Sequence, residues 1–398
     1  MQRKYETEIA HIWSPEKKME LWTEIELLNL ECWDPVVGAE ARMKLYPPAY
    51  IPVQWVGMEQ QVRLKEQEIG HEVEAFVQYL NSFYRTGLWH KGLASSDLVE
   101  CWIADCVKKS EWLIEGMVNR LYTYTWIKAK ELCEDVTDGF THGQRAEPTT
   151  WGMRYRMWGE SFAECPLTQG PSLAKISGAI GTGVVTHPDL PGKVHVKLNL
   201  DMALISSQIV PRAALASHLV AIYQIVMGAE KVANDLRMLY TFRQIDMSLM
   251  PLGSSSMPHK VNPHELEQVI GMCKMVMSMV DCVNRTNADN WLERDLVHSS
   301  VEREFLPMIF NHTYYALSKL LTIIERVTPS HQSTWPTDEQ YRVYSSIALA
   351  KTLQHDSDRK EARNKSMDVA MTNWLEYREE VRRAAKDLII GPEKATDA

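Results

Sequence analysis

The sequence predicts an all-α protein built around a bundle of long helices. From Arg212 to Phe242, apolar residues recur at steps of three and four, which places them on one face of a helix. At a rise of about 1.5 Å per residue, this helix would be roughly 46 Å long, a length typical of helical bundles. The apolar residues are Leu215, Leu219, Ile222, Val226, Ala229, Ala233, Leu236 and Leu239.

Three further long helices are expected. Residues 98–133 contain no proline, and Asp97 with Glu100 resembles a capping box at the start. Residues 265–285 repeat apolar side chains at helical spacing, and residues 300–326 contain Pro307, which should kink or break that helix. Alternating patterns are rare, and "GKVHVKL" (192–198) is the best candidate for a strand.

Length and punctuation predict three domains. A chain of 398 residues is long enough for two or three. We expect an N-terminal helical domain over 1–96, a central long-helix domain over 97–328 and a short C-terminal helical domain over 329–398. The segment "TPSHQSTWPTD" (328–338) would link the last two.

Composition narrows the possible functions. The formal net charge of −9 argues against general nucleic-acid binding, which relies on neutralising phosphates. The N-terminus has no apolar stretch of the signal-peptide kind, and no run approaches the roughly 18 apolar residues of a membrane span. The seven cysteines are scattered without a C-x-x-C pair, which favours reduced thiols. We therefore expect a cytoplasmic protein.

The stretch "LGSSSMPHKVNPHELEQ" (252–268) carries the most specific signal. The pattern G-S-S-x-M-P-x-K-x-N-P fixes eight positions, so a chance match is on the order of 10⁻¹⁰ per start site. It resembles the hallmark loop of the fumarase/aspartase superfamily, whose members eliminate fumarate from a succinyl group. Proton abstraction beside a carboxylate creates a doubly charged intermediate, which needs several donors. The resemblance implies Ser254 as base, Lys260 in catalysis, and Ser255, Met257 and Asn262 as substrate contacts.

The block "FTHGQRAEPTT" (140–150) resembles a second superfamily motif. A lone histidine is more often structural, but a leaving nitrogen needs an acid near neutral pH. The resemblance implies that His142 is this acid, that Glu267 orients it, and that Thr141 contacts the substrate.

Residues 68–100 resemble the superfamily's first block. His71 and His90 match its histidines, His71 in catalysis and His90 in substrate binding, and Ser95 and Ser96 supply hydroxyl groups. The chain departs from the pattern at Gly70, where relatives often have Arg, and at Ala94, where they usually have Thr. Ser96 or Asp97 could also be a simple helix cap.

The block "NWLERDLVHSSVER" (290–303) resembles adenylosuccinate lyases. Arg294, Ser299 and Arg303 match the residues that hold the nucleotide end in that family, and arginine forks suit a phosphate. Charge pairs on a helix surface are the alternative.

Two shorter segments agree with this resemblance. Arg3, Lys4 and Tyr5 precede an I-W-S segment and correspond to an Arg-Tyr pair at the phosphate. In "SSQIVPR" (206–212), Gln208 and Arg212 would reach the succinyl carboxylates.

The resemblance implies a three-domain fumarase/aspartase-type fold and an adenylosuccinate lyase activity on adenylosuccinate and SAICAR, releasing fumarate. It implies no metal, no organic cofactor, no nucleic-acid or membrane partner, and a homotetramer with sites shared between subunits. The alternatives are an argininosuccinate lyase, a fumarase, an aspartase, or an inactive structural relative.

Overall fold

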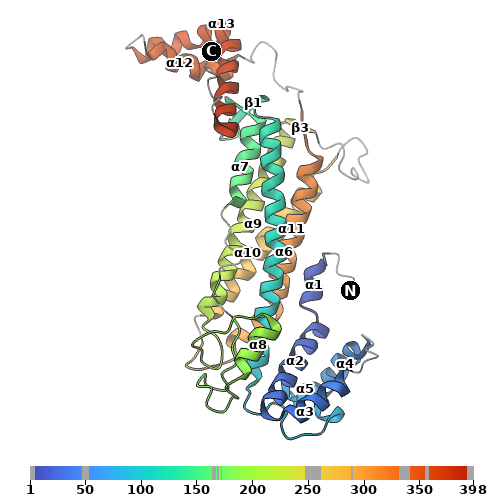
Figure 1. Cartoon of the computed structure of the whole chain (residues 1–398). Coiled ribbons are helices and arrows are strands. Elements are labelled where there is room, and N and C mark those ends of the chain that lie inside the picture. The colour runs from blue at the N-terminus through green and yellow to red at the C-terminus, as the bar shows by residue number, and fades with distance from the viewer. Residues whose placement is uncertain are drawn as a thin grey trace, which may run out of the picture. The chain divides into compact units, whose positions relative to one another are not determined.

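The structure of the chain is a computed structural model that describes residues 5–46, 53–163, 167, 170–171, 173–246, 261–287, 290–330, 341–354 and 358–391 (Figure 1). Helices dominate it, which confirms the all-α prediction. The helices are α1 (Glu8–Ile12), α2 (Pro15–Trp33), α3 (Pro35–Leu45), α4 (Val53–Ile69), α5 (Glu72–Phe83), α6 (Ser95–Glu131), α7 (Trp151–Ala163), α8 (Leu190–Leu198), α9 (Arg212–Thr241), α10 (His264–Asn287), α11 (Val297–Arg326), the 3-10 turn η2 (Arg342–Tyr344), α12 (Ser345–Leu353) and α13 (Arg359–Ile390). The strands are β1 (Val136–Thr141), β2 (Gln144–Thr150), β3 (Ile245–Asp246) and β4 (Thr328–Pro329). β1 and β2 form an antiparallel hairpin, and β3 and β4, which are distant in sequence, form a short antiparallel pair.

Contacts divide the chain into two compact units. The first comprises Met1–Gly116, Pro166–Val226 and Met272–Tyr315. The second comprises Met117–Cys165, Met227–Gly271 and Ala316–Ala398. The long helices α6, α9, α10 and α11 each contribute residues to both units. The three-domain division at residues 96 and 328 stays a prediction.

Aromatic side chains hold α2 and α5 in the first unit. Trp22 is fully buried, and its ring meets Phe76 edge to face at a centroid separation of 5.5 Å. Its indole N–H donates to the carbonyl of Leu98 at 3.1 Å, so the apolar ring is buried with its polar atom satisfied. Both helices begin at an N-cap residue whose side chain accepts a hydrogen bond from a backbone N–H group of the first turn, Ser14 for α2 and His71 for α5.

The second unit contains the β1–β2 hairpin and the C-terminal helices. Trp158 of α7 donates to Asp235 of α9 at 3.0 Å. Tyr344, Ala370 and Tyr377 form a small buried cluster between η2, α12 and α13. This cluster gives the C-terminal region an apolar centre of its own.

The long helices lie close to their predicted ranges. Leu219, Ile222 and Val226 of α9 are fully buried, as the periodicity predicts. α9 is also long and apolar enough to cross a membrane by composition alone, but half of its most apolar window is buried in the structure, as in a core helix. α11 continues through Pro307, so the helix does not break there, and the kink at this proline stays a prediction.

Two local predictions are wrong. Residues 192–198 form most of α8 rather than a strand, because Leu190 and Val194, four residues apart, are the side chains that are buried, and Val196 is exposed. The Asp97–Glu100 capping box does not form. α6 begins before Asp97, whose carboxylate accepts from the backbone N–H of Ala94 at 2.7 Å.

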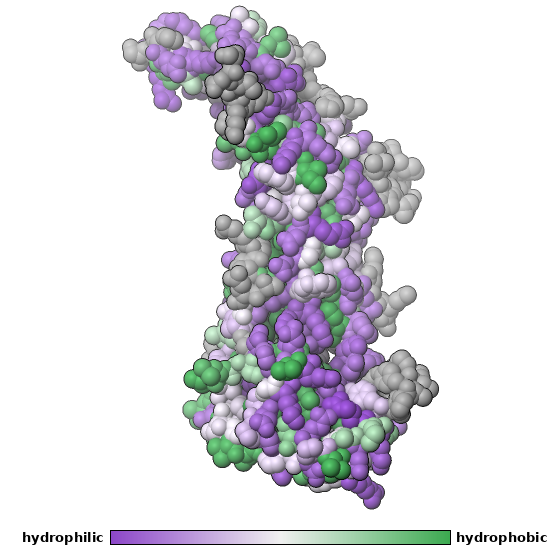
Figure 2. Space-filling view, viewed as in Figure 1, coloured by the Kyte–Doolittle hydropathy of each residue, from purple (hydrophilic) through white to green (hydrophobic). Residues whose placement is uncertain are grey.

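Exposed apolar side chains gather on the loops of the first unit. Figure 2 shows hydrophobic residues at the lower left, over the loops beside α8. The exposed residues of these segments are Ile180, Val184, Val185, Val196, Leu204 and Ile205. Leu204 is 97% exposed, and a group of exposed apolar side chains of this kind is typical of a binding surface.

Candidate active site

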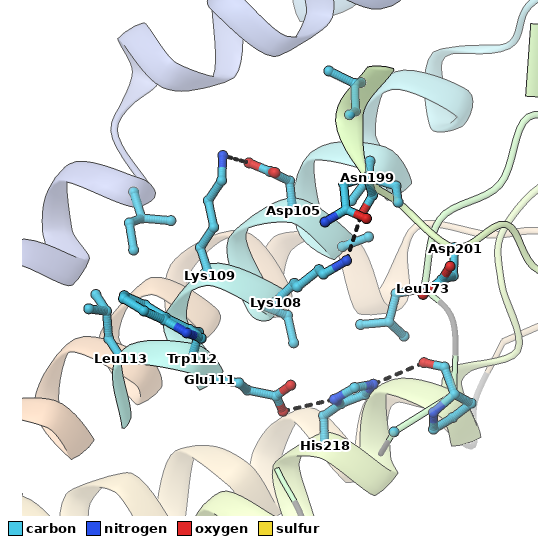
Figure 3. A pocket seen from close by; sticks show the side chains of 17 residues that line it. Asp105, Lys108, Lys109, Glu111, Trp112, Leu113, Leu173, Asn199, Asp201 and His218 are labelled. Carbon is cyan, nitrogen blue, oxygen red and sulfur yellow. Dashed lines mark hydrogen bonds and ion pairs between the residues drawn. The ribbon is translucent and has the colours of Figure 1, made fainter. Parts of the chain in front are cut away.

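The larger cavity of the first unit is lined by charged side chains that are already paired with other groups. It has a volume of about 590 Å³ and lies between α6, α9 and the segment that follows α8 (Figure 3). Each of its charged side chains has a partner. The pairs are Asp105 with Lys109, Lys108 with the carbonyl of Asn199, Glu111 with His218, and Asp201 with His195. Among the described lining residues a ligand would find an apolar wall and charged side chains that are already paired, so this cavity is a weak candidate for catalysis.

A second cavity, of about 300 Å³, brings predicted site residues together. We call it the α2–α6–α11 pocket after the helices that form most of its wall. Its lining includes Ser96, Arg294, Ser299 and Arg303, which come from two blocks about 200 positions apart in the sequence. Lys18, Glu72, Trp102, His298 and Glu302 also line it. This is the pocket in which two arginines and hydroxyl groups could meet an anion.

Several buried polar atoms around this pocket have no hydrogen-bond partner among the residues that the structure describes. They are Ser96 Oγ, Trp102 Nε1, Arg294 Nε and Glu302 Oε1. An unsatisfied buried polar atom costs about 1–3 kcal/mol, so such atoms are rare unless a ligand or water completes them. Their concentration distinguishes this pocket from the larger cavity.

Arg303 belongs to a cluster of ion pairs with Glu72 and Lys18 in the pocket lining. Its Nη1 donates to Glu72 Oε2 at 2.8 Å, and Lys18 bonds the other oxygen of Glu72. Burial opposes ionisation of Glu72, but the two cations outweigh it and hold the pKa of this carboxyl below its ordinary value. The side chain of Arg303 is 47% exposed, so a ligand can reach it in its present position.

The two residues expected to bind the succinyl carboxylates are already paired in this structure. Arg212 bonds Glu100 through Nη2, and its Nη1 lies 3.5 Å from Glu302 Oε2. Gln208 accepts from Arg294 and donates to the carbonyl of Ala179 at 2.8 Å. Arg212 is buried, whereas Gln208 tethers Arg294 at the pocket wall.

A buried ion pair fixes the turn that carries Ser95 and Ser96. Asp97 and Lys175 are fully buried at the side chain, with Nζ 2.7 Å from Oδ1. Asp97 also accepts from the backbone N–H of Ser177 at 2.9 Å, and Lys175 donates to the carbonyl of Gly178 at 3.1 Å. The start of α6 is therefore joined to the 175–178 segment.

The two histidines of the first block have different surroundings. His90 has a positive φ of 58° and its Nδ1 lies 2.6 Å from the fully buried Glu26. Burial opposes protonation of His90, but the hydrogen bond and charge of Glu26 raise its pKa. His71 is exposed and accepts from the backbone N–H of Glu74 at 3.1 Å, which makes it the cap of α5.

The second block forms the tip of the β1–β2 hairpin. Thr141 pairs with Gln144, so His142 and Gly143 are the two turn residues. Both have positive φ, 52° and 71°, as a type I′ turn requires. This turn leaves Thr141 and His142 exposed, with the imidazole at the end of a short ladder. The hairpin itself was not predicted from the sequence.

Glu267 and Asn262 lie at the start of α10. Glu267 is in the first turn of the helix, half exposed, with Oε1 3.5 Å from Arg237 Nη2. Asn262 precedes the helix and is partly buried.

The remaining predicted residues lie at or beyond the edges of the described chain. Arg3, Lys4, Ser254, Ser255, Met257 and Lys260 lie outside the described residues. Tyr5 is described, and its ring meets Tyr315 edge to face at 5.1 Å.

Sequence reasoning assigned no role to several residues of the α2–α6–α11 pocket. Among them are five that lie inside or beside the recognised motifs, namely Lys18, Glu72, Trp102, His298 and Glu302. A charged residue directly beside a motif residue, as Glu302 is beside Arg303, is the one sequence signal that could have drawn attention to it.

Comparison with known proteins gives the class. The family described as "Lyase" matches residues 56–278, more than half of the chain, so this chain belongs to that lyase family. Its predicted place in the fumarase/aspartase superfamily is confirmed.

Individual relatives agree with this class. The chain is 29% identical over 384 residues to an adenylosuccinate lyase of Staphylococcus saprophyticus, with 92% of this chain and 87% of that protein covered. Among solved structures, a fumarate lyase from Mesorhizobium sp. BNC1 has a TM-score of 0.76 at 16% identity, covering 97% of this chain and 92% of that one. A 3-carboxy-cis,cis-muconate lactonizing enzyme from Pseudomonas putida has a TM-score of 0.73 at 17% identity, covering 96% and 89%. These two likenesses show the fold.

Proposed function

We propose that this lyase cleaves adenylosuccinate to AMP and fumarate, and SAICAR to AICAR and fumarate, in purine nucleotide biosynthesis. The observation that carries the proposal is the α2–α6–α11 pocket. It gathers Arg294, Ser299 and Arg303 in one place, with the Oγ of Ser96 buried and unpaired nearby. Two guanidinium forks and hydroxyl groups suit a phosphate far better than they suit the small, unphosphorylated substrates of related lyases.

In the proposed reaction, Ser254 removes the proton beside the carboxylate and His142 protonates the leaving nitrogen. Glu267 orients His142, and His71, Lys260 and Asn262 stabilise the charge that develops on the substrate. The exposed position of His142 at a hairpin tip supports this role, since an exposed ring can reach a substrate. The reaction needs an acid, a base and fixed charges, so we propose no metal or organic cofactor.

We further propose a cytoplasmic homotetramer whose sites draw on several subunits. Ser95 and Ser96 begin α6, and the β1 strand with Thr141 follows its other end. A helix of 37 residues spans roughly 55 Å, too far for both ends to line one small-molecule pocket. The exposed apolar side chains beside α8 support burial against other copies.

The phosphate assignment is tested by Arg303→Ala. This variant should bind AMP roughly ten- to a hundredfold more weakly, because a charged hydrogen bond contributes about 1.5–3 kcal/mol. Binding of fumarate should change little. Arg285→Ala, an exposed arginine paired with Asp281 on α10, is the matched control and should leave both affinities unchanged. Equal losses for AMP and fumarate would place Arg303 away from the phosphate.

Shared sites are tested by mixing two inactive variants, Ser254→Ala and His142→Ala, after mild dissociation. Each alone should lose about 10²–10⁴ in turnover, as expected for a general base or acid. Hybrid tetramers should regain activity, because some sites then contain both wild-type groups. A monomer by light scattering, or verified hybrids without activity, would contradict the shared-site proposal.

A further inference from the structure

The α2–α6–α11 pocket contains a buried carboxylate that no step of the proposed reaction uses. Glu302 lines the pocket, and its side chain is 3% exposed. Its Oε2 lies 3.5 Å from Arg212 Nη1, beyond a good hydrogen bond, and its Oε1 has no partner in the described part of the chain. A buried carboxylate so poorly compensated is costly in its ionised form.

Arg212 is not a sufficient counter-ion for Glu302, because it is shared. Its other nitrogen bonds Glu100, which also accepts from the backbone N–H of Val210 at 3.2 Å. Arg212 therefore makes its hydrogen bond to Glu100 and only a longer contact to Glu302. When both carboxyls are ionised, the Glu100–Arg212–Glu302 cluster has two negative charges and one positive charge. Burial, the largest influence, and the charge of Glu100 together raise the pKa of Glu302 to about 7, against the opposing effect of Arg212.

The other charged groups of the pocket do not relieve this excess. Lys18 and Arg303 both pair with Glu72, and Glu304 is exposed at the pocket edge. Arg294 is tethered to the neutral Gln208. His298 bonds Asn290, and burial together with Arg212 and Arg294 lowers its pKa to about 4, so it is neutral at pH 7.

The lining contains four cations and four carboxyls, counting Arg212 behind the wall. The cations are Lys18, Arg212, Arg294 and Arg303, and the carboxyls are Glu72, Glu100, Glu302 and Glu304. With all four carboxyls ionised the set is balanced, so a dianionic phosphate that enters this pocket adds two negative charges to it. Protonating one carboxyl removes one negative charge, and this costs least at Glu302, whose pKa is already raised to about 7.

We propose that Glu302 takes up a proton when a phosphorylated ligand binds beside Arg294, Ser299 and Arg303, which makes it a positioning residue that couples anion binding to protonation. The inference rests on the proposed function, since it takes the ligand to be a phosphate ester. Uptake spares the pocket a repulsion between the phosphate and a buried carboxylate. It also predicts that binding weakens as pH rises through the range in which free Glu302 loses its proton.

The magnitude follows from linkage. If the phosphate strengthens proton binding at Glu302 tenfold, the complex takes up about half a proton at pH 7.5, and AMP affinity falls about threefold between pH 7 and pH 8. At this pH the phosphate of AMP is already almost fully dianionic, because the second pKa of a phosphate ester is about 6. Proton release from the ligand is therefore a small background.

The test is titration calorimetry of the full chain with AMP at pH 7.5 in HEPES and in Tris, which differ in ionisation enthalpy. The wild-type protein should show a buffer-dependent enthalpy corresponding to about half a proton taken up. Glu302→Gln, which is isosteric and permanently neutral, should show no such uptake, and its AMP affinity should be nearly flat from pH 7 to pH 9. Glu304→Gln, an exposed carboxylate two residues away, is the matched control and should keep the wild-type uptake.

The outcomes separate this inference from the proposed function. AMP binding with no proton uptake, or uptake that persists in Glu302→Gln, would overturn the role of Glu302 and leave the proposed function intact. A folded wild-type protein that does not bind AMP would overturn the proposed function, and this inference with it. Loss of uptake in Glu302→Gln alone supports the inference.

Discussion

Lys175→Met should destabilise the first unit strongly, although Lys175 lies outside the proposed chemistry. Its ammonium is fully buried at 2.7 Å from Asp97, and it also donates to Gly178 at 3.1 Å. Methionine preserves most of the side-chain volume but leaves the Asp97 charge without its counter-ion. Breaking a buried ion pair by removing one partner costs about 3–5 kcal/mol.

Part of that cost should be offset, because Asp97 keeps its backbone donors. Ser177 and Ala94 still offer N–H groups at 2.9 and 2.7 Å. We therefore expect a loss of about 3 kcal/mol, at the lower end of that range. Adding Asp97→Asn should cost less than the sum of the two single changes, because the second substitution removes the uncompensated charge.

The assay is urea unfolding of wild type and variants at one fixed protein concentration, since assembly shifts apparent stability. Lys109→Met is the control. This lysine also forms an ion pair with an aspartate, at 2.6 Å, but it is 58% exposed, so its loss should cost less than about 0.5 kcal/mol. A Lys175→Met loss no larger than that of Lys109→Met would refute the reasoning from burial.

Two further predictions follow from local geometry and charge. Gly92→Ala should destabilise the protein by more than about 2 kcal/mol, because residue 92 has a φ of +75° and an added Cβ would lie 2.1 Å from the carbonyl oxygen of Val185. Gly116→Ala, in an open helical position, should be neutral or stabilising in the same thermal melt, and equal effects at the two sites would contradict this explanation. Glu302→Gln should stabilise the protein relative to wild type above pH 7 by up to about 3 kcal/mol. The reason is that folding raises the pKa of the Glu302 carboxyl from 4.5 to about 7. Such a carboxyl contributes fully to stability only below its unfolded-state pKa, and this contribution is lost as the pH rises through 7. Urea midpoints measured from pH 5 to pH 8.5 check the sign, and a constant difference between the two proteins would show that Glu302 does not titrate in this range.

Long-range periodicity predicted most of the fold. The helix over 212–242 appears as Arg212–Thr241, and the one over 98–133 as Ser95–Glu131, because an apolar stripe buried along many turns leaves little freedom in where a helix runs. Short elements were harder to predict. The β1–β2 hairpin shows little alternation of apolar and polar residues. Its turn needs positive φ at His142 and Gly143, and a histidine in the sequence does not indicate a turn of this kind.

The site was predictable where motifs carry it and not where pairing decides it. Arg294, Ser299 and Arg303, which one sequence block supplies, line one pocket, with Arg294 just before α11 and the other two in its first turns. The Glu100–Arg212–Glu302 cluster joins residues that are far apart in the sequence, and no local pattern indicates that two carboxyls share one guanidinium. Burial and charge sharing are properties of the fold, so they became visible only with the structure.

The central claim is tested most directly by an ultraviolet assay of the purified protein with adenylosuccinate, SAICAR, argininosuccinate, malate and aspartate in parallel. The account predicts turnover of adenylosuccinate and SAICAR with one fumarate released per AMP or AICAR formed, no comparable turnover of the other three, and loss of activity in Ser254→Ala. Fumarate release from argininosuccinate, malate or aspartate alone, or from none of the five, would contradict it.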